Sequence, residues 1–557
     1  TGAKKAKKFQ RTYKLQPDTT FVIKHNMRTR KVKVTATTTD GKPIAIKSRI
    51  IDDNSVEILE KGNKNVRIII NEVIKEHKSF WSELSQYALR FAMLTRSVSV
   101  RYRNTKSWHI PQFIPQIGDI FGQTKKYGNR FAPGLDFAFG FVNESYLDKA
   151  MNNGWLMCDQ NQTSPAIHSR TEEFHMEVNL EPIRGLKITL TGNRTDNRTT
   201  QMQFMFDDMV PTYSGSYTKT HLALATALRG YNSKDGYNSQ AFNAFLDNIP
   251  IVAQRLQSQY EKTSYPTNGF FKDRPEAGTP FDSKKTPINQ RGSDVLIPAF
   301  LAAYSGRDAN KIDLNPFPGI GAILPNWKLT YDGLSRIQAI KKYFKSFTLT
   351  HAYQCTYSVG SFTSYSDWVG VNKGMGFTQD GASGNAVPTS PYNITTATVT
   401  EKFAPLIGIN ATMNNNITFN VEYRDSRTLS LSATAAQIVE SSQRGLQVGA
   451  GYKIANFNSI LKIRGRQQGV SNDLTLNLNF QLNSTTALIR KIETKLTQAT
   501  SGARTLALNF SANYVLSKRI TLGAYFDHQM NTPLVSTSSY PTSNSNYGIS
   551  INMSLAR

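Results

Sequence analysis

The stretch DLTLNLNFQLNS, residues 473–484, decides the fold class of this chain. Apolar residues occupy every second position of the stretch: Leu474, Leu476, Leu478, Phe480 and Leu482. Uncharged polar residues fill the positions between them. Because side chains alternate between the two faces of a strand, this period of two predicts a β-strand with one apolar and one polar face. The apolar face has to pack against either a second sheet or lipid.

The same alternation recurs along the second half of the chain, at residues 417–423, 446–452, 506–514, 520–526 and 547–555. The longer runs exceed the mode of about five or six residues for strands of soluble proteins. They match the roughly nine to eleven residues that a tilted strand needs to cross a bilayer. The length of the runs therefore favours lipid as the partner of the apolar faces.

Two further features indicate a membrane barrel. Tyr423, Tyr452 and Tyr514 end apolar rows, where an interfacial girdle of aromatic residues would place them. Short links such as residues 413–416 alternate with long links such as residues 531–546, as in outer-membrane barrels. We predict an all-β membrane fold, a large antiparallel transmembrane β-barrel, with the five apolar residues of the opening stretch facing lipid. The alternative is a soluble β-sandwich or solenoid.

Composition and motifs exclude several classes of protein. Lys and Arg outnumber Asp and Glu by 66 to 40, but the basic residues are scattered, which favours solvated loops over a nucleic-acid partner. The two cysteines, Cys158 and Cys355, form no CxxC pair, so we expect no metal site and no cofactor. No metalloprotease, α/β-hydrolase or P-loop motif is present, and we expect no enzyme activity.

The pattern divides the chain into four parts. Residues 1–80 read as a small soluble β-rich module with a linker, residues 81–229 and 328–557 as barrel strands with their loops, and residues 230–327 as a partly helical insertion. The insertion holds a stripe of apolar residues at helical spacing: Phe242, Phe245, Leu246, Ile249, Leu256 and Tyr260. We predict that this stripe packs on protein, either as a cap over the barrel mouth or as a docking surface.

Longer motifs resemble a known family. FIPQIGDIFG (residues 113–122), EPIRGLKITLTGNRT, SDVLIPAFLAAYSGRD and the closing YPTSNSNYGISINMSLAR are similar to the C-terminal part of the SprA/Sov family. This family is the outer-membrane translocon of the type IX secretion system of Bacteroidota. The resemblance covers about residues 75 to 557 in unbroken order. It implies a single-chain barrel wide enough for folded cargo, of which this chain forms part of the wall.

The resemblance also implies partners and a location. The partners would be the remaining N-terminal part of the translocon chain, a porin-like shuttle barrel, a plug protein, secreted cargo proteins and outer-membrane lipid. The location would be the outer membrane of a Gram-negative bacterium. The alternatives are a smaller closed outer-membrane porin or transporter, and a soluble β-rich surface adhesin. Pairing of the last strand with a strand near residues 91–100 would favour the closed porin.

Overall fold

The computed structural model describes most of the chain in two compact units, Thr1–Met93 and Leu94–Arg557. The described residues are 7–15, 20–38, 43–59, 62, 65–72, 94–116, 118–125, 131–157, 164–204, 211–231, 235–372, 374–455, 457, 472–517, 519–535 and 539–554. Cys158 and the predicted boundary at residue 80 lie outside these ranges. Each unit is treated by itself below.

The first unit consists of two small sheets around one core. Its strands are β1 (Lys8–Lys14), β2 (Phe21–Lys24), β3 (Val32–Thr38), β4 (Pro43–Ile44), β5 (Ser48–Ile50), β6 (Ser55–Ile58) and β7 (Asn65–Glu72). One sheet has the order β1-β7-β3-β4, and the other has the order β2-β6-β5. Ile23 and Val56 of the second sheet share a core with Ile68 and Ile70 of the first, and all four are buried.

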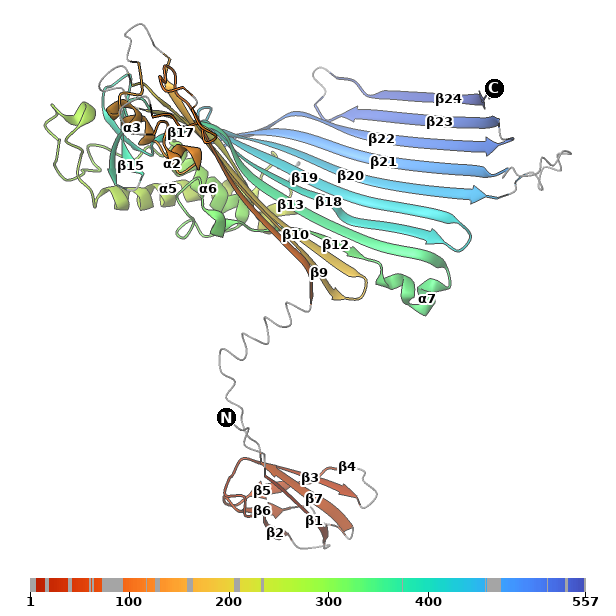
Figure 1. Ribbon diagram of the computed structural model, residues 1–557. Coiled ribbons are helices and arrows are strands. Elements are labelled where there is room, and N and C mark those ends of the chain that lie inside the picture. Colours follow the sequence, from red (N-terminus) through yellow and green to blue (C-terminus); the bar gives the residue numbers. More distant parts are fainter. Residues whose placement is uncertain are drawn as a thin grey trace. The chain divides into compact units, whose positions relative to one another are not determined.

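The second unit is built on one antiparallel sheet of 14 strands (Figure 1). Along its main path the strands follow chain order: β8 (Thr95–His109), β9 (Ala166–Ile183), β10 (Leu186–Met202), β11 (Thr212–Thr220), β13 (Phe344–Ser364), β18 (Thr396–Met413), β19 (Ile417–Ser432), β20 (Gln437–Ile454), β21 (Leu474–Lys491), β22 (Thr497–Val515), β23 (Ile520–Pro533) and β24 (Thr542–Met553). Two short strands, β12 (Asn326–Tyr331) and β17 (Tyr392–Ile394), pair off this path. The predicted all-β fold with a large antiparallel sheet is confirmed.

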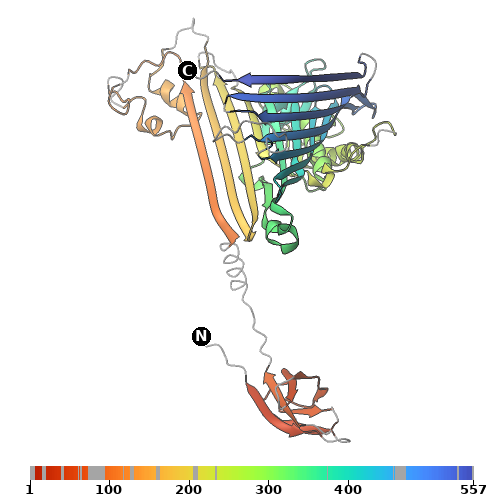
Figure 2. The ribbon, with the colours of Figure 1, turned by 90° about the vertical axis from the view of Figure 1, so that its right-hand side faces the viewer.

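The long strands arise from the alternation in the sequence. Strand β21, which contains the opening stretch, pairs with β20 along its whole length, from Leu474 opposite Ile454 to Lys491 opposite Gln437. Figure 2 shows the first strands of the sheet running steeply and the last strands running across the view, which is the twist expected of a many-stranded sheet.

The sheet is open. Strand β8 pairs only with β9, and strand β24 pairs only with β23, within the residues that the structure describes. The pairing between the last strand and the region of residues 91–100, which would close a porin-like barrel inside this chain, is absent from these described pairings.

The two ends of the sheet differ in their connections. At one end, here the turn end, residues 184–185, 414–416 and 516–519 link neighbouring strands. At the other end, here the loop end, the long segments 110–165 and 365–395 leave the sheet beside short links such as residues 433–436 and 492–496. Segment 221–325 leaves the sheet at mid-height, because β11 pairs with β10 as far as Arg194 and β12 continues the pairing from Thr191. The two longest links between neighbouring strands, residues 110–165 and 365–395, therefore lie at the loop end, as expected for an outer-membrane barrel with short periplasmic turns and long extracellular loops.

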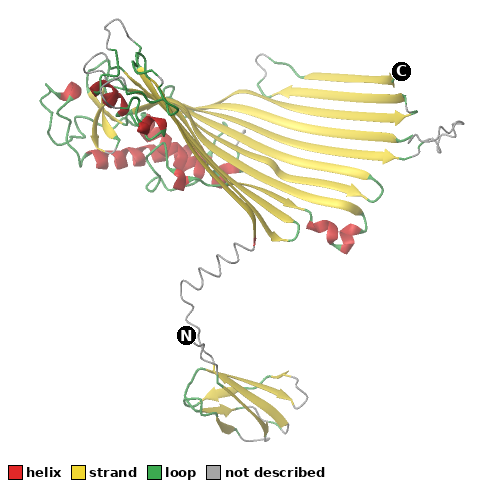
Figure 3. Ribbon diagram, in the orientation of Figure 1, coloured by secondary structure: helices red, strands yellow, loops and turns green. Residues whose placement is uncertain are grey.

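The helices gather mainly at the loop end, where Figure 3 shows them in red. They are α2 (Leu135–Ala138), α3 (Tyr146–Asn152), α4 (Leu224–Ala227), α5 (Gln240–Tyr260) and α6 (Ser293–Ser305), whereas α7 (Gln338–Lys341) lies at the turn end. A small sheet of β14 (Val369–Asn372), β15 (Met375–Gln379) and β16 (Ala386–Thr389) lies in the loop between β13 and β18. Within the described residues, no helix has the length and apolar character to cross a membrane.

Candidate functional site

One face of the large sheet carries a continuous row of apolar side chains, here the apolar band. The five predicted lipid-facing residues, Leu474, Leu476, Leu478, Phe480 and Leu482, lie in it on β21. At mid-height, directly paired residues extend the band across eight strands: Phe347, Ala411, Phe419, Ala450, Leu478, Phe510, Phe526 and Tyr547. The register of the sheet therefore joins rows that are far apart in sequence into one surface.

The apolar band is open to its surroundings. Leu478 is 43% exposed and Phe526 is 38% exposed. The outcome that would have overturned the membrane interpretation was a second sheet burying Leu474, Leu478 and Leu482, and the partly exposed Leu478 does not have such a cover. Contact of these side chains with lipid remains a prediction.

The opposite face of the same strands is polar. Asn477, Asn479 and Gln481 alternate with the band residues of β21. The Asn477 amide donates to Ser511 Oγ at 3.4 Å in the neighbouring strand. A face of uncharged hydrogen-bonding groups is suited to water, as in the lumen of an outer-membrane barrel.

Towards the loop end, the face that carries the apolar band becomes charged and buried. Arg427 of β19 pairs with Glu401 of β18, with Nη2 to Oε2 at 2.8 Å. Arg490 of β21 pairs with Glu440 of β20, with Nη2 to Oε2 at 2.7 Å. The complete set is here the ion-pair layer: Glu172, Arg194, Asp196, Glu401, Arg427, Glu440 and Arg490.

The helical insertion, residues 221–325, covers the ion-pair layer. Arg427 Nη1 donates to the carbonyl oxygen of Thr226 at 3.1 Å, and Arg490 Nη1 donates to that of Tyr237 at 2.8 Å. The Arg490 guanidinium also lies 5.6 Å from the ring centroid of Phe242. Each arginine therefore joins a strand carboxylate to the backbone of the insertion, which fixes the insertion to the sheet.

The predicted apolar stripe of the insertion lies on α5. Leu246 is partly buried, and the other five residues are buried: Phe242, Phe245, Ile249, Leu256 and Tyr260. Most of the stripe packs against α6 and against strand residues on the face of the apolar band, among them Val399, Leu429 and Ile438. The protein surface on which the stripe packs is therefore largely α6 and the sheet of the same chain. The role of the insertion as a cap or a docking surface remains a prediction.

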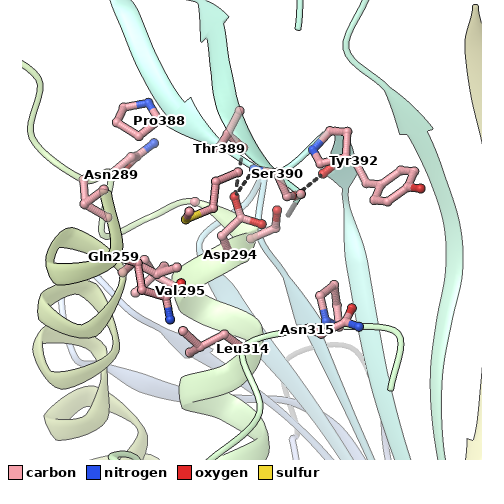
Figure 4. A pocket seen from close by; sticks show the side chains of 18 of the residues that line it. Gln259, Asn289, Asp294, Val295, Leu314, Asn315, Pro388, Thr389, Ser390 and Tyr392 are labelled. Carbon is pink, nitrogen blue, oxygen red and sulfur yellow. Dashed lines mark hydrogen bonds between the residues drawn. The ribbon is translucent and has the colours of Figure 1, made fainter. Parts of the chain in front are cut away.

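A cavity of about 640 Å³ lies between α5, α6 and the β16–β17 segment (Figure 4). Asp294 at the start of α6 accepts hydrogen bonds from Thr389 Oγ1 at 2.9 Å and from the backbone N–H of Ser390 at 2.8 Å. Tyr260 at the end of α5 donates to the carbonyl oxygen of Gly376 at 2.9 Å, and burial raises the pKa of Tyr260, which keeps it a neutral donor. These bonds hold the helices to the loop between β13 and β18.

The ion-pair layer was not predicted from the sequence. The row of Phe419, Val421 and Tyr423 continues on the same face with Asp425 and Arg427, and then becomes apolar again. One signal in the sequence could have predicted this layer: charged residues interrupt the alternating apolar positions of a long strand, and the apolar residues then resume at the same alternating positions. Their burial predicts a protein cover, since a buried charge needs a partner.

Comparisons with known proteins give only distant likeness. No family model and no curated protein matches the chain. Among solved structures, the β domain of the Bordetella autotransporter BrkA is 7% identical, with a TM-score of 0.19, and the match covers 71% of this chain and 96% of that one. OmpT, an outer-membrane protein of Vibrio cholerae, is 8% identical, with a TM-score of 0.18 and 69% and 91% coverage. Because TM-scores this low support no conclusion about function, the function is inferred from the geometry of the chain itself.

Proposed function

We propose that this chain forms part of the wall of a very large outer-membrane β-barrel that conducts folded proteins out of the cell, in a type IX secretion system. The observation that carries the proposal is a sheet of 14 strands that has an apolar band on one face, a polar opposite face and two edges without a partner strand among the described residues. Since barrel diameter grows with strand number, further strands joined at these edges would give a lumen wider than that of a solute porin.

The unpaired edges support this proposal over a closed porin. Edge strands expose rows of backbone N–H and C=O groups, and these groups cannot remain unpaired inside a bilayer. Strand β24 is exposed along nearly its whole length, with Ile549 82% exposed. We propose that strands of the remaining N-terminal part of the translocon chain complete the wall at β8 and β24.

A soluble adhesin is less consistent with the exposed apolar surface. Soluble monomers rarely expose contiguous apolar patches of more than a few hundred Å². The apolar band crosses eight strands and includes Leu478, Phe510 and Ile551, all more than a third exposed. Lipid is the surrounding in which such a band is stable.

The proposal also places the helical insertion. If the apolar band faces lipid, the insertion lies on the outer face of the wall at the extracellular end, because it packs on the face of the band. It would then leave the lumen open, so that closure of the idle channel falls to another component, such as a plug protein. A shuttle barrel in the same membrane would meet this outer face.

Secretion tests the function directly. We expect depletion of this chain to remove many proteins from the culture medium at once, measured by mass spectrometry of the medium. A porin or adhesin would leave the secreted proteins unchanged. Loss of small-solute uptake with normal secretion would contradict the proposal.

Cross-linking tests the open wall. In a background lacking Cys158 and Cys355, cysteines at Tyr102 in β8 and Tyr547 in β24 should form no bond within one chain under oxidation, because the two edges are separated by other strands. A matched pair at Phe526 and Tyr547, which are opposite each other in β23 and β24, is the positive control. An efficient Tyr102–Tyr547 cross-link within one chain would favour the closed porin.

A further inference from the structure

A groove of about 450 Å³ opens within the apolar band near the turn end of the sheet. Its walls are almost entirely apolar and come from the β9–β10 hairpin, β12, β13 and β18, through residues such as Leu186, Leu329, Leu349 and Leu406. The one imidazole in its wall, that of His351, uses Nδ1 to donate to the carbonyl oxygen of Leu406 at 2.7 Å. The groove is therefore suited to a hydrocarbon chain.

Two irregularities in the sheet lie at this groove, since Thr350, Leu406 and Ile407 line it. The register between β13 and β18 shifts between Thr350 and Tyr353, and the register between β18 and β19 shifts between Phe403 and Ile407. Pro405 lies in the second irregularity, where it has no N–H to donate to the ladder. The regular pairing of the strands is therefore interrupted beside the hollow.

A basic, amphipathic segment adjoins the groove. Tyr331 lines the groove, and residues 332–343 follow it directly and form α7 beyond the ends of β12 and β13 (Figure 1). Ile337 is 49% exposed and Tyr343 is 54% exposed. Exposed apolar and aromatic groups at the end of a membrane strand are typical of the lipid–water interface.

The segment also carries unneutralised positive charge. The ammonium groups of Lys341 and Lys342 are exposed, and within the described residues neither forms an ion pair. The one carboxylate of residues 332–343, that of Asp332, pairs with Arg336 at 3.4 Å. The Asn414 side chain holds the backbone of the segment through the carbonyl oxygens of Lys341 and Lys342, at 3.3 and 2.8 Å.

From this combination we infer a binding site for one anionic phospholipid, with an acyl chain in the groove and the phosphate headgroup at Lys341 and Lys342. The inference rests on the proposed membrane location. It adds a specific ligand at the turn end, which corresponds to the periplasmic leaflet, where phospholipids are found. Clusters of basic residues beside membrane segments favour anionic headgroups in this way.

Native mass spectrometry of the detergent-purified protein tests the site, with phosphatidylglycerol and phosphatidylethanolamine as probes. We expect one tightly bound phosphatidylglycerol in preference to phosphatidylethanolamine. The double variant K341Q/K342Q should weaken phosphatidylglycerol binding by about thirtyfold, since each basic residue contributes attraction to an anionic headgroup. K284Q/K285Q, which removes two exposed lysines from the insertion at the other end of the sheet, should leave binding unchanged.

A second variant tests the groove. Ile407 is 58% exposed and lines the groove, so Ile407→Trp should fill the hollow without disturbing a buried core and should displace the lipid. Equal binding of both lipids, or binding insensitive to both K341Q/K342Q and I407W, would overturn the inference. Failure of the protein to insert into liposomes at all would instead contradict the proposed membrane function.

Discussion

The two halves of strands β19 to β21 share one face but meet different surroundings. Near the turn end this face carries Val421 and Val448, which are half-buried, and Leu478, which is exposed. Near the loop end it carries Arg427 and Arg490, which are buried under the helical insertion. The difference teaches that alternation fixes which side chains share a face, whereas buried paired charges on that face indicate a protein cover.

Breaking one ion pair should have the largest effect on this arrangement. Arg490→Met leaves Glu440 buried without its partner, because Arg490 is fully buried and Glu440 is nearly so. We expect a loss of about 3–5 kcal/mol in the free energy of unfolding. Denaturant unfolding of the refolded protein, followed by tryptophan fluorescence, measures it.

The double variant R490M/E440L is the matched control. Replacing both charges by apolar groups of similar volume should restore most of the lost stability, since no buried charge remains. An equal loss of stability in the single and double variants would mean that the layer is held by shape and not by charge pairing.

A charge placed in the apolar band should have the next largest effect. Leu478→Arg should destabilise the folded, membrane-inserted state by about 2–4 kcal/mol, as a basic residue does near the bilayer midplane. The neighbouring Asn479→Arg, on the polar face, should cost little because its guanidinium stays in water. Reversible folding into phospholipid vesicles measures both. Equal effects of the two substitutions would contradict the assignment of faces.

The cavity contact of Asp294 should have the smallest effect of the three. Asp294→Ala removes the acceptor of two hydrogen bonds, from Thr389 and Ser390, and should cost about 1–3 kcal/mol. Local loosening should appear as faster hydrogen exchange in residues 386–394. Asp273→Ala, at an exposed position of the same insertion, should leave exchange unchanged. Unchanged exchange in both variants would show that α6 is held without this carboxylate.

Much of the fold could be predicted from the sequence because strand periodicity is a local property. The run of Leu474 to Leu482 predicts a strand and its two faces, and the stripe of Phe242, Phe245 and Ile249 predicts a helix that needs an apolar partner. The long link predicted over residues 531–546 is shorter in the structure, because β23 continues to Pro533 and β24 begins at Thr542.

Only the tertiary structure decided where these elements meet. Glu401 and Arg427 lie 26 positions apart, and Arg427 and Thr226 lie 201 positions apart, so no local pattern could pair them. The open edges of the sheet could not be predicted either, because a strand is known to be an edge only when its pairing with all other strands is known. Sequence by itself determined the strands, their faces and the need for a cover, because these depend on neighbours a few residues away. The choice of cover, the ion-pair layer and the groove in the apolar band depend on register between distant strands, which only the folded chain specifies.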